Sequence, residues 1–189
     1  MKQARFWTLI LSAAALAGCY WPIENGSSRD TPLHFGLYVT PDPDQNPIDP
    51  PERFTGWHTG TDFEIEDFEK DQDVEVYAVC GGKVRFSGFA SGYGGVVAQE
   101  CTLKGEPVNV IYGHLATAGL PAEGQMLTQG QKIGLLGADR SNDTDGSRKH
   151  LHLTIHRGKE LVMLGYVQTE AELKDFIDPQ TVLPWPDED

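Results

Sequence analysis

Alternation of apolar and polar residues is the strongest pattern in the chain, and it is clearest over residues 149–158. The polar positions of this segment hold three histidines and a threonine: His150, His152, Thr154 and His156. The residues between them are apolar: Leu151, Leu153 and Ile155. Successive side chains of a strand point to opposite faces. The segment is therefore predicted to be a strand with one apolar face and one face that carries three imidazoles.

Strand-like segments separated by glycine turns recur along the chain. They are 34–39, 58–65, 73–80, 81–89, 92–101, 106–115, 130–139 and 149–158. Only 169–177 has a helical pattern, with Thr169 as the N-cap and Glu172 three residues later. This arrangement predicts a mainly β protein with an antiparallel, sandwich-like sheet and one short C-terminal helix.

The length of 189 residues suits one domain with a real core. A net charge of -13 argues against nucleic-acid binding, which requires basic patches, and favours a solvated acidic surface. Residues 40–57 carry five prolines and are predicted to form an extended loop. Such a long loop in a compact domain often lies over a functional site.

The N-terminus has the pattern of a secretory signal. A basic start and a short apolar run end at Leu16-Ala17-Gly18-Cys19, which resembles the lipobox of bacterial lipoproteins. We therefore expect a signal peptide over 1–18 and a lipidated Cys19 that anchors the protein to a membrane of the cell envelope, in the periplasm or on the outer surface. The expected domains are then a tether (19–33), the folded domain (34–183) and an acidic tail (184–189).

Export also affects the remaining cysteines. Cys80 and Cys101 form an even pair in an oxidising compartment, so we predict a disulfide between them.

The polar residues include a possible zinc set. His58 and Asp62 stand four apart in "HTGTD", His114 ends a strand in "YGHL", and His150 and His152 share one strand face. Imidazole and carboxylate both suit zinc, and a catalytic site uses three protein ligands. The chemistry alone leaves open which three bind. The helical H-E-x-x-H motif is absent from the sequence.

Over roughly residues 34–158 the chain resembles the lysostaphin-type, or LytM-like, zinc metallopeptidases that cleave peptidoglycan. The segments that carry the resemblance are "GWHTGTDFEI", "VYAVCGGKVRFSGFASGYGGVVAQE", "VNVIYGHL", "GQKIGLLGADRSND" and "KHLHLTI". The resemblance implies His58, Asp62 and His152 as ligands of one zinc ion per chain, and His114 and His150 as the catalytic pair. A histidine with a pKa near 7 can accept a proton from water and return it to the leaving amine, while the other stabilises the oxyanion. Which histidine has which role stays open.

The resemblance implies a zinc endopeptidase that hydrolyses peptide stems or cross-bridges of peptidoglycan. Together with the lipobox, we expect a lipid-anchored protein, and we expect it to be a monomer. The alternative is a non-catalytic LytM-like module that binds and activates another cell-wall hydrolase. The family pattern has a small, Gly/Pro-rich turn before H-L-H, where this chain has Arg148 and Lys149. These cations could meet an anionic substrate group or only shape the turn. We expect His156 at the surface or groove rim and a structural role for His34.

Overall fold

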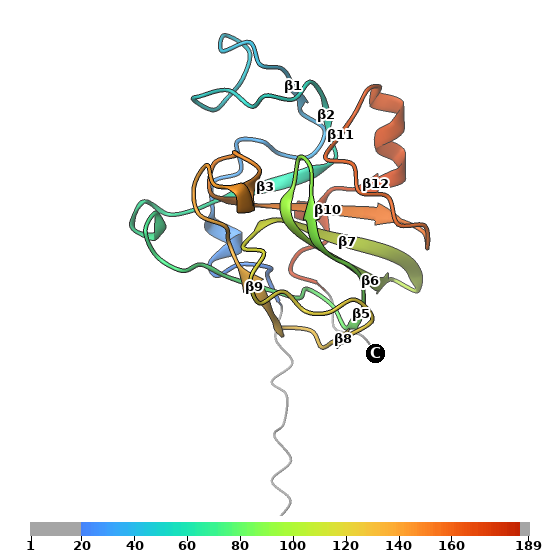
Figure 1. Ribbon diagram of the computed structural model, residues 1–189. Helices are drawn as coiled ribbons and strands as arrows, with labels where there is room; N and C mark the ends of the chain where they lie inside the picture. The colour runs from blue at the N-terminus through green and yellow to red at the C-terminus, as the bar shows by residue number, and fades with distance from the viewer. Residues whose placement is uncertain (1–19, 186–189) are drawn as a thin grey trace, which may run out of the picture.

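The computed structural model describes residues 20–185, and most of its regular structure is β (Figure 1). The strands are β1 (Tyr38–Val39), β2 (Gly56–His58), β3 (Gly60–Glu64), β4 (Glu75–Tyr77), β5 (Gly82–Ala90), β6 (Gly94–Leu103), β7 (Glu106–Leu115), β8 (Met126–Leu127), β9 (Lys132–Leu135), β10 (His150–Arg157), β11 (Tyr166–Val167) and β12 (Phe176–Ile177). Short 3-10 helices are η1 (Gly26–Ser28), η2 (Asp67–Glu69), η3 (Asn142–Thr144), η4 (Glu170–Asp175) and η5 (Pro179–Thr181).

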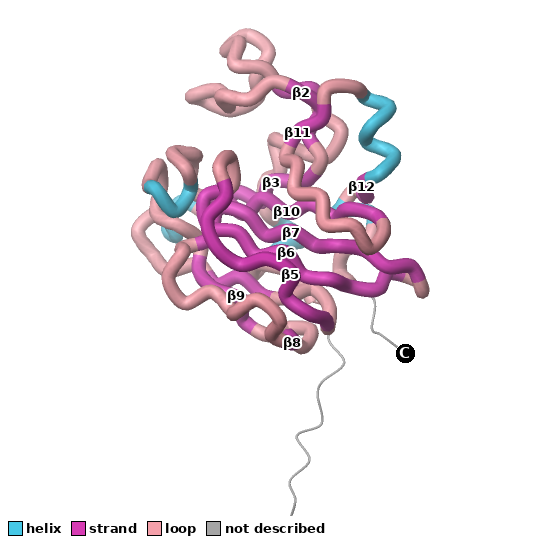
Figure 2. Tube along the Cα trace, turned by 45° about the vertical axis from the view of Figure 1, so that its right-hand side comes forward, coloured by secondary structure: helices cyan, strands magenta, loops and turns pink. Residues whose placement is uncertain are grey.

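One antiparallel sheet forms the body of the protein, in the order β12-β10-β7-β6-β5-β8, with β3 beside β10 (Figure 2). A small sheet, β1-β2-β11, stands at one end of it, and β4 pairs with β9. These antiparallel pairings confirm the predicted mainly β fold. The strands predicted at 34–39, 73–80 and 130–139 are shorter than expected, and β8, β11 and β12 are too short to give a sequence pattern.

Both faces of β10 are buried. Leu151, Leu153 and Ile155 have no exposed surface and belong to the main apolar core, as the alternation predicts. The opposite face, with His150 and His152, is also almost completely covered. Loops and the small β1-β2-β11 sheet therefore enclose the polar face of β10 and create a protected place for its imidazoles.

The predicted C-terminal helix is present, but as the 3-10 helix η4. The side chain of Thr169 accepts from the backbone N–H of Glu172, and the side chain of Glu172 accepts from that of Thr169, as in a capping box. None of the six residues of η4, all of them described, is buried. Because an α-helix this short needs packing of an apolar face to be stable, the segment stays a single 3-10 piece.

The segment 20–33 differs from the expected tether, because it packs against the folded domain. Ile23 and Leu33 are buried in the interior. The guanidinium of Arg29 pairs with the carboxylate of Glu69, with nitrogen–oxygen distances of 2.6 and 2.8 Å. Two apolar side chains and a buried ion pair hold this segment, and it is part of the domain.

The C-terminal limit also differs from the expected start of the tail at residue 184. Trp185 is fully buried and forms a β-bridge with Tyr20. The expected signal peptide (1–18), Cys19 and the last four residues lie outside the described residues. Among residues 20–185, no helix has the length and hydropathy needed to cross a membrane.

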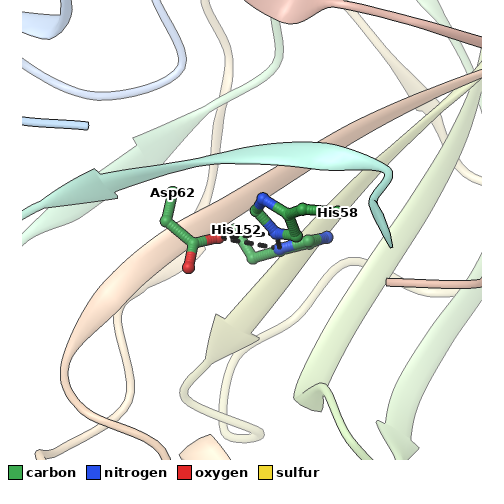
Figure 3. Close-up of side chains that lie close together, drawn as sticks. All are labelled: His58, Asp62 and His152. Atoms are coloured by element: carbon green, nitrogen blue, oxygen red, sulfur yellow. Dashed lines mark hydrogen bonds and ion pairs between the residues drawn. The ribbon is translucent and has the colours of Figure 1, made fainter. Parts of the chain in front are cut away.

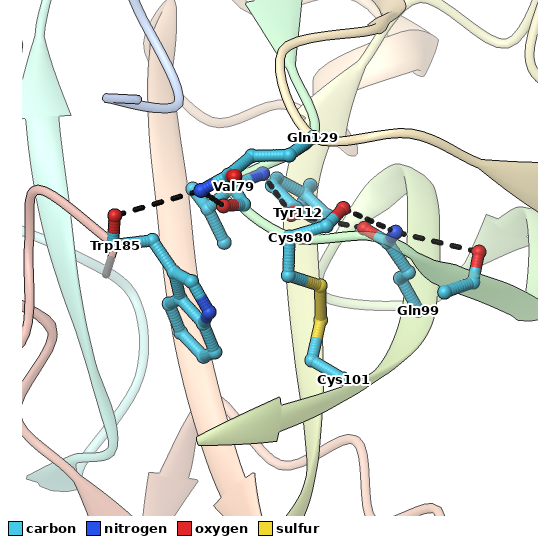
Figure 4. The surroundings of a disulfide bond; sticks show 8 residues. Val79, Cys80, Gln99, Cys101, Tyr112, Gln129 and Trp185 are labelled. Atoms are coloured by element: carbon cyan, nitrogen blue, oxygen red, sulfur yellow. Dashed lines mark hydrogen bonds between the residues drawn. A yellow bond between two sulfur atoms is a disulfide. The ribbon is translucent and has the colours of Figure 1, made fainter. Parts of the chain in front are cut away.

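The predicted disulfide between Cys80 and Cys101 is present, with 6.0 Å between the two Cα atoms (Figure 4). It joins the turn before β5 to β6. Beside it, the side-chain amide of Gln99 donates to the carbonyl of Cys80 at 2.9 Å, and the hydroxyl of Tyr112 donates to Gln99 at 3.2 Å. The disulfide and these hydrogen bonds tie together β6, β7 and the chain before β5.

Candidate metal centre and cleft

Three side chains from three strands point toward one another (Figure 3). His58 comes from the end of β2, Asp62 from β3 and His152 from β10, where Asp62 and His152 are direct cross-strand partners. His152 Nδ1 lies 2.8 Å from Asp62 Oδ1 and 3.0 Å from His58 Nε2, and His58 Nε2 lies 3.4 Å from Asp62 Oδ1. All three are almost fully buried. The antiparallel register of β3 and β10 therefore brings the "HTGTD" motif and the "HLH" motif together.

Gly60 allows this close approach of β3 to β10. A Cβ atom at Gly60 would lie 2.4 Å from the carbonyl oxygen of Leu153 and 2.6 Å from Thr154 Oγ1. Such contacts are too short for a real side chain, so only glycine fits at this position of "HTGTD". It lets the chain pass from His58 to Asp62 directly against the strand that carries His152.

Hydrogen bonds to the outer ring nitrogens set the tautomers of both histidines. His58 Nδ1 lies 3.3 Å from the carbonyl oxygen of His34, which can only accept, so Nδ1 carries the proton. His152 Nε2 lies 2.7 Å from Thr154 Oγ1. The hydroxyl of Thr59 donates its proton to the carbonyl of Leu164, so Thr59 can accept a hydrogen bond from Thr154. When the Thr154 hydroxyl donates to Thr59, its oxygen is the acceptor for the N–H at Nε2 of His152. Nε2 of His58 and Nδ1 of His152 therefore present lone pairs to the cluster.

This donor set fits a zinc ion. Two imidazole lone pairs and one carboxylate oxygen face the same small space, and acceptors placed this way repel unless a cation lies between them. Ligand atoms on a tetrahedral zinc at its usual bond lengths are about 3.3 Å apart, close to the observed separations. Burial raises the pKa of Asp62, but the charges and the hydrogen bonds of the surrounding histidines together lower it to well below its usual value. Burial lowers the pKa of His152 to about 4, which keeps this ring neutral and able to act as a ligand.

Arg148 holds the second oxygen of Asp62. Its Nη2 atom donates to Asp62 Oδ2 at 2.9 Å, and the same guanidinium pairs with Glu64 and, at 3.5 Å, with Glu52. Lys149 lies in the interior and donates to the backbone carbonyls of Glu69 and others nearby. Both cations are thus engaged within the protein. The unusual charges before "HLH" were visible in the sequence, but their partners were not.

The other two histidines of the predicted site lie side by side. The ring centroids of His114 and His150 are 4.4 Å apart. His114 Nδ1 donates to the carbonyl of Thr144 at 3.2 Å, which leaves its Nε2 with a lone pair. His150 Nδ1 donates to the carbonyl of Arg148 at 2.9 Å, and its Nε2 lies 3.1 Å from Asp62 Oδ2. Burial lowers the pKa of His114 well below its usual value. His114 has a φ of 61°, a conformation that non-glycine residues adopt mainly where the surrounding structure imposes it.

A cleft of about 290 Å³ opens onto these histidines and has aromatic walls. The ring of Tyr166 lies 5.2 Å from that of His58, and the edge of the Tyr93 ring faces His152 at 5.4 Å. Gly113 makes room for Tyr93, since a Cβ there would lie 2.7 Å from its ring. Tyr93 and Tyr166 were not identified from the sequence, because a tyrosine in a β protein is usually a core residue.

The proline-rich segment 40–57 contributes to the same cleft, as its length suggested. Its residues Glu52, Phe54 and Thr55 line the wall. Arg53 donates to the backbone carbonyl of Asp145 at 2.6 Å and pairs with its carboxylate, which also accepts from the backbone N–H of Gly92 at 2.7 Å. The loop is thereby fastened across the rim of the cleft.

The side chains of the remaining histidines lie away from the cluster. His156 is buried beside Phe176, with ring centroids 5.1 Å apart, and so the expectation of a surface or rim position is wrong. Phe176 belongs to β12, which pairs with β10 and takes up the last two residues of the segment predicted as helix, 169–177. The side chain of His34 is exposed, and its backbone carbonyl orients His58.

Comparison with solved structures finds the same fold in several proteins. LytU is 20% identical over 81% of this chain and 83% of its own, with a TM-score of 0.52. The antimicrobial peptidase lysostaphin from Staphylococcus simulans is 19% identical over 82% of this chain and 49% of its own, with a TM-score of 0.52. A chain of the SpoIIQ-SpoIIIAH pore forming complex is 16% identical over 91% of this chain and 94% of its own, with a TM-score of 0.56.

No curated protein sequence matches the chain significantly. The present chain spans about half the length of lysostaphin, so the likeness concerns one domain of that protein. Residues 56–163 match peptidase family M23. This segment contains every histidine and carboxylate of the cluster and the paired histidines beside it. The chain therefore belongs to peptidase family M23, with the lysostaphin-type fold.

Proposed function

We propose that the protein is a zinc-dependent endopeptidase that hydrolyses peptide cross-links of bacterial peptidoglycan and is held at a membrane by a lipidated Cys19. One observation carries this proposal. The metal-binding cluster of His58, Asp62 and His152 and the pair of His114 and His150 meet at one cleft, within a chain of a peptidase family.

His58, Asp62 and His152 would hold the metal, and a bound zinc ion supplies Lewis-acid chemistry there. Thr154 and the carbonyl of His34 keep the two imidazoles oriented, and Arg148 keeps one oxygen of Asp62 turned away from the cluster.

His114 and His150 would move protons. Each has its Nδ1 proton fixed on a backbone carbonyl, so Nε2 is the atom that exchanges a proton. Nε2 of His150 also lies 3.1 Å from Asp62 Oδ2, which favours its protonated form. In peptide hydrolysis one Nε2 accepts a proton from the attacking water, and the leaving amine must receive a proton. The other Nε2, when protonated, can donate to the developing oxyanion. The pair supplies both functions within one ring-to-ring contact.

The cleft suits an extended peptide. Its aromatic walls offer apolar contact, and polar side chains such as Glu52, Ser147 and Gln168 line it beside the histidines. Peptidoglycan is the proposed substrate because the family contains cell-wall peptidases, and because a lipoprotein signal would place the protein in the cell envelope, where this polymer is found.

The test is digestion of purified peptidoglycan, with mass analysis of the released fragments and with and without a chelator. We expect peptide fragments that disappear with the chelator. His150→Ala should abolish hydrolysis and keep zinc, whereas Asp62→Ala should lose zinc. His34→Ala serves as a matched control, since this side chain is exposed and only its backbone contacts the cluster.

Two results would contradict the proposal in different ways. Full cleavage by His150→Ala would refute the role given to this histidine. Bound zinc with no hydrolysis of any peptidoglycan would refute the enzyme and favour the non-catalytic module that activates another hydrolase.

A further inference from the structure

The described chain starts inside the folded domain, and this has a consequence for a lipid anchor. The backbone carbonyl of Tyr20 accepts from the N–H of Trp185 at 3.3 Å, and its ring lies against Gly130. Trp21 packs beside the core, and Ile23 is inside it. Cys19 precedes Tyr20 directly in the sequence. An acyl group on Cys19 would thus be joined to the domain without a flexible linker.

The start of the described chain and the cleft lie at opposite ends of the domain. Both views place β8 beside the point where the described chain begins, and the β1-β2-β11 sheet at the far end (Figures 1 and 2). Strand β5 connects the two ends. Its first residues, Gly82 and Lys83, pair with β8, and the turn that follows it, Ser91 and Gly92, lines the cleft. At the rise of a strand, this distance is about 30 Å.

The β8 end has a surface that is compatible with lipid headgroups. Met126 is 66% exposed, and its cross-strand partner Lys83 is also exposed. A methionine can enter the headgroup layer, and a lysine can extend its ammonium toward lipid phosphates. Acyl chains on Cys19 would supply the affinity. Met126 and Lys83 therefore need not provide affinity; it is enough that they do not repel the headgroups. The net charge of -13 means that much of the remaining surface would be repelled by anionic lipids.

We propose that the face formed by β8 and the start of β5 lies against the bilayer that holds acylated Cys19, so that the cleft opens away from the membrane about 30 Å above it. This inference rests on the lipidation in the proposed function and adds a fixed orientation. The partner is a phospholipid surface. The consequence is a restricted reach: the cleft meets only peptide strands that come within this short distance of the membrane.

The experiment uses the full chain, produced in a bacterium that acylates lipoproteins and reconstituted in phospholipid vesicles. A fluorophore is attached through Met126→Cys on β8 or, in a second protein, through Asp44→Cys on the exposed loop at the far end. Cys80 and Cys101 are in the disulfide, and the thiol of Cys19 is acylated in this preparation, so the native cysteines do not compete for the label. Vesicles with a short-range quencher on the headgroup report proximity to the membrane.

We expect strong quenching of the label at position 126 and little quenching at position 44. A Gly-Ser linker inserted between Cys19 and Tyr20 should remove most of the difference, because the domain could then rotate. Equal quenching of the two labels in the chain without the linker would overturn the orientation. Intact-mass analysis that finds no acyl group would overturn it as well.

Neither equal quenching nor the absence of an acyl group would bear on the proposed peptidase activity. Hydrolysis of peptidoglycan can be measured on residues 20–189 released in solution by replacing the signal and Cys19. The chain from Tyr20 onward contains the whole described domain. Failure of the orientation and failure of the proposed enzyme are therefore separate results.

Discussion

Replacement of Thr154 by valine tests how the fold prepares His152 for a metal. Thr154 Oγ1 lies 2.7 Å from His152 Nε2 and does not belong to the metal cluster. Thr154→Val keeps the size and branching of the side chain but leaves a buried imidazole N–H without an acceptor. An unsatisfied buried donor costs about 1–3 kcal/mol. Loss of such a partner typically weakens metal binding about 10- to 100-fold, which is about 1.4–2.7 kcal/mol. The two estimates agree.

The assay is competition for zinc with a chelator of known affinity, together with thermal unfolding of the metal-free protein. We expect Thr154→Val to bind zinc about 10- to 100-fold more weakly and Thr154→Ser to recover most of the loss.

Thr61 provides a matched control. It lies on the neighbouring strand β3, is fully buried, and its hydroxyl is without a hydrogen-bond partner among residues 20–185. Thr61→Val should therefore leave zinc affinity unchanged. Wild-type affinity in Thr154→Val, or equal losses in both valine variants, would refute the tautomer argument.

Three further predictions concern stability. Replacing both Cys80 and Cys101 by serine should lower the free energy of unfolding by about 3 kcal/mol, since the disulfide closes a loop with a sequence separation of 21; denaturant unfolding measures it. Ile23→Ala should cost about 2–5 kcal/mol in the same assay, whereas no loss would mean that the N-terminal segment is a free tether after all. Arg148→Gln should cost about 3–5 kcal/mol because the buried carboxylate of Asp62 and the half-buried one of Glu64 lose their cation. Its control, Arg85→Gln, breaks an exposed ion pair and should cost less than about 1 kcal/mol.

Arg148 has a position that connects stability and chemistry. Its guanidinium lies between the Asp62 carboxylate and those of Glu64 and Glu52, and Glu52 also lines the cleft. Three carboxylates so close together would repel one another without a cation. The arginine therefore allows an acidic protein to concentrate carboxylates around Asp62 and leaves Asp62 Oδ1 facing His58 and His152.

Local patterns in the sequence determined the β character and the positions of the chemical groups. The alternation over 149–158 required a strand with two different faces, because side chains of a strand alternate with a period of two. The cysteine pair and the Thr169–Glu172 cap were also readable, since each depends on residue type and short spacing. The five site residues were identified from motifs that resemble those of a family. These residues are far apart in the sequence, so no local pattern could show that they lie close together in space.

Tertiary structure decided what depends on register and on packing between distant segments. The pairing of β3 with β10 puts Asp62 opposite His152, and Thr154 selects the nitrogen that this histidine presents. Tyr166 reaches the cleft on a two-residue strand, which is too short to have a period. The segment 20–33 looked like a linker because its few apolar residues have no periodicity, yet the domain has sites that bury them. Such contacts join residues far apart in the chain, and no local pattern records them.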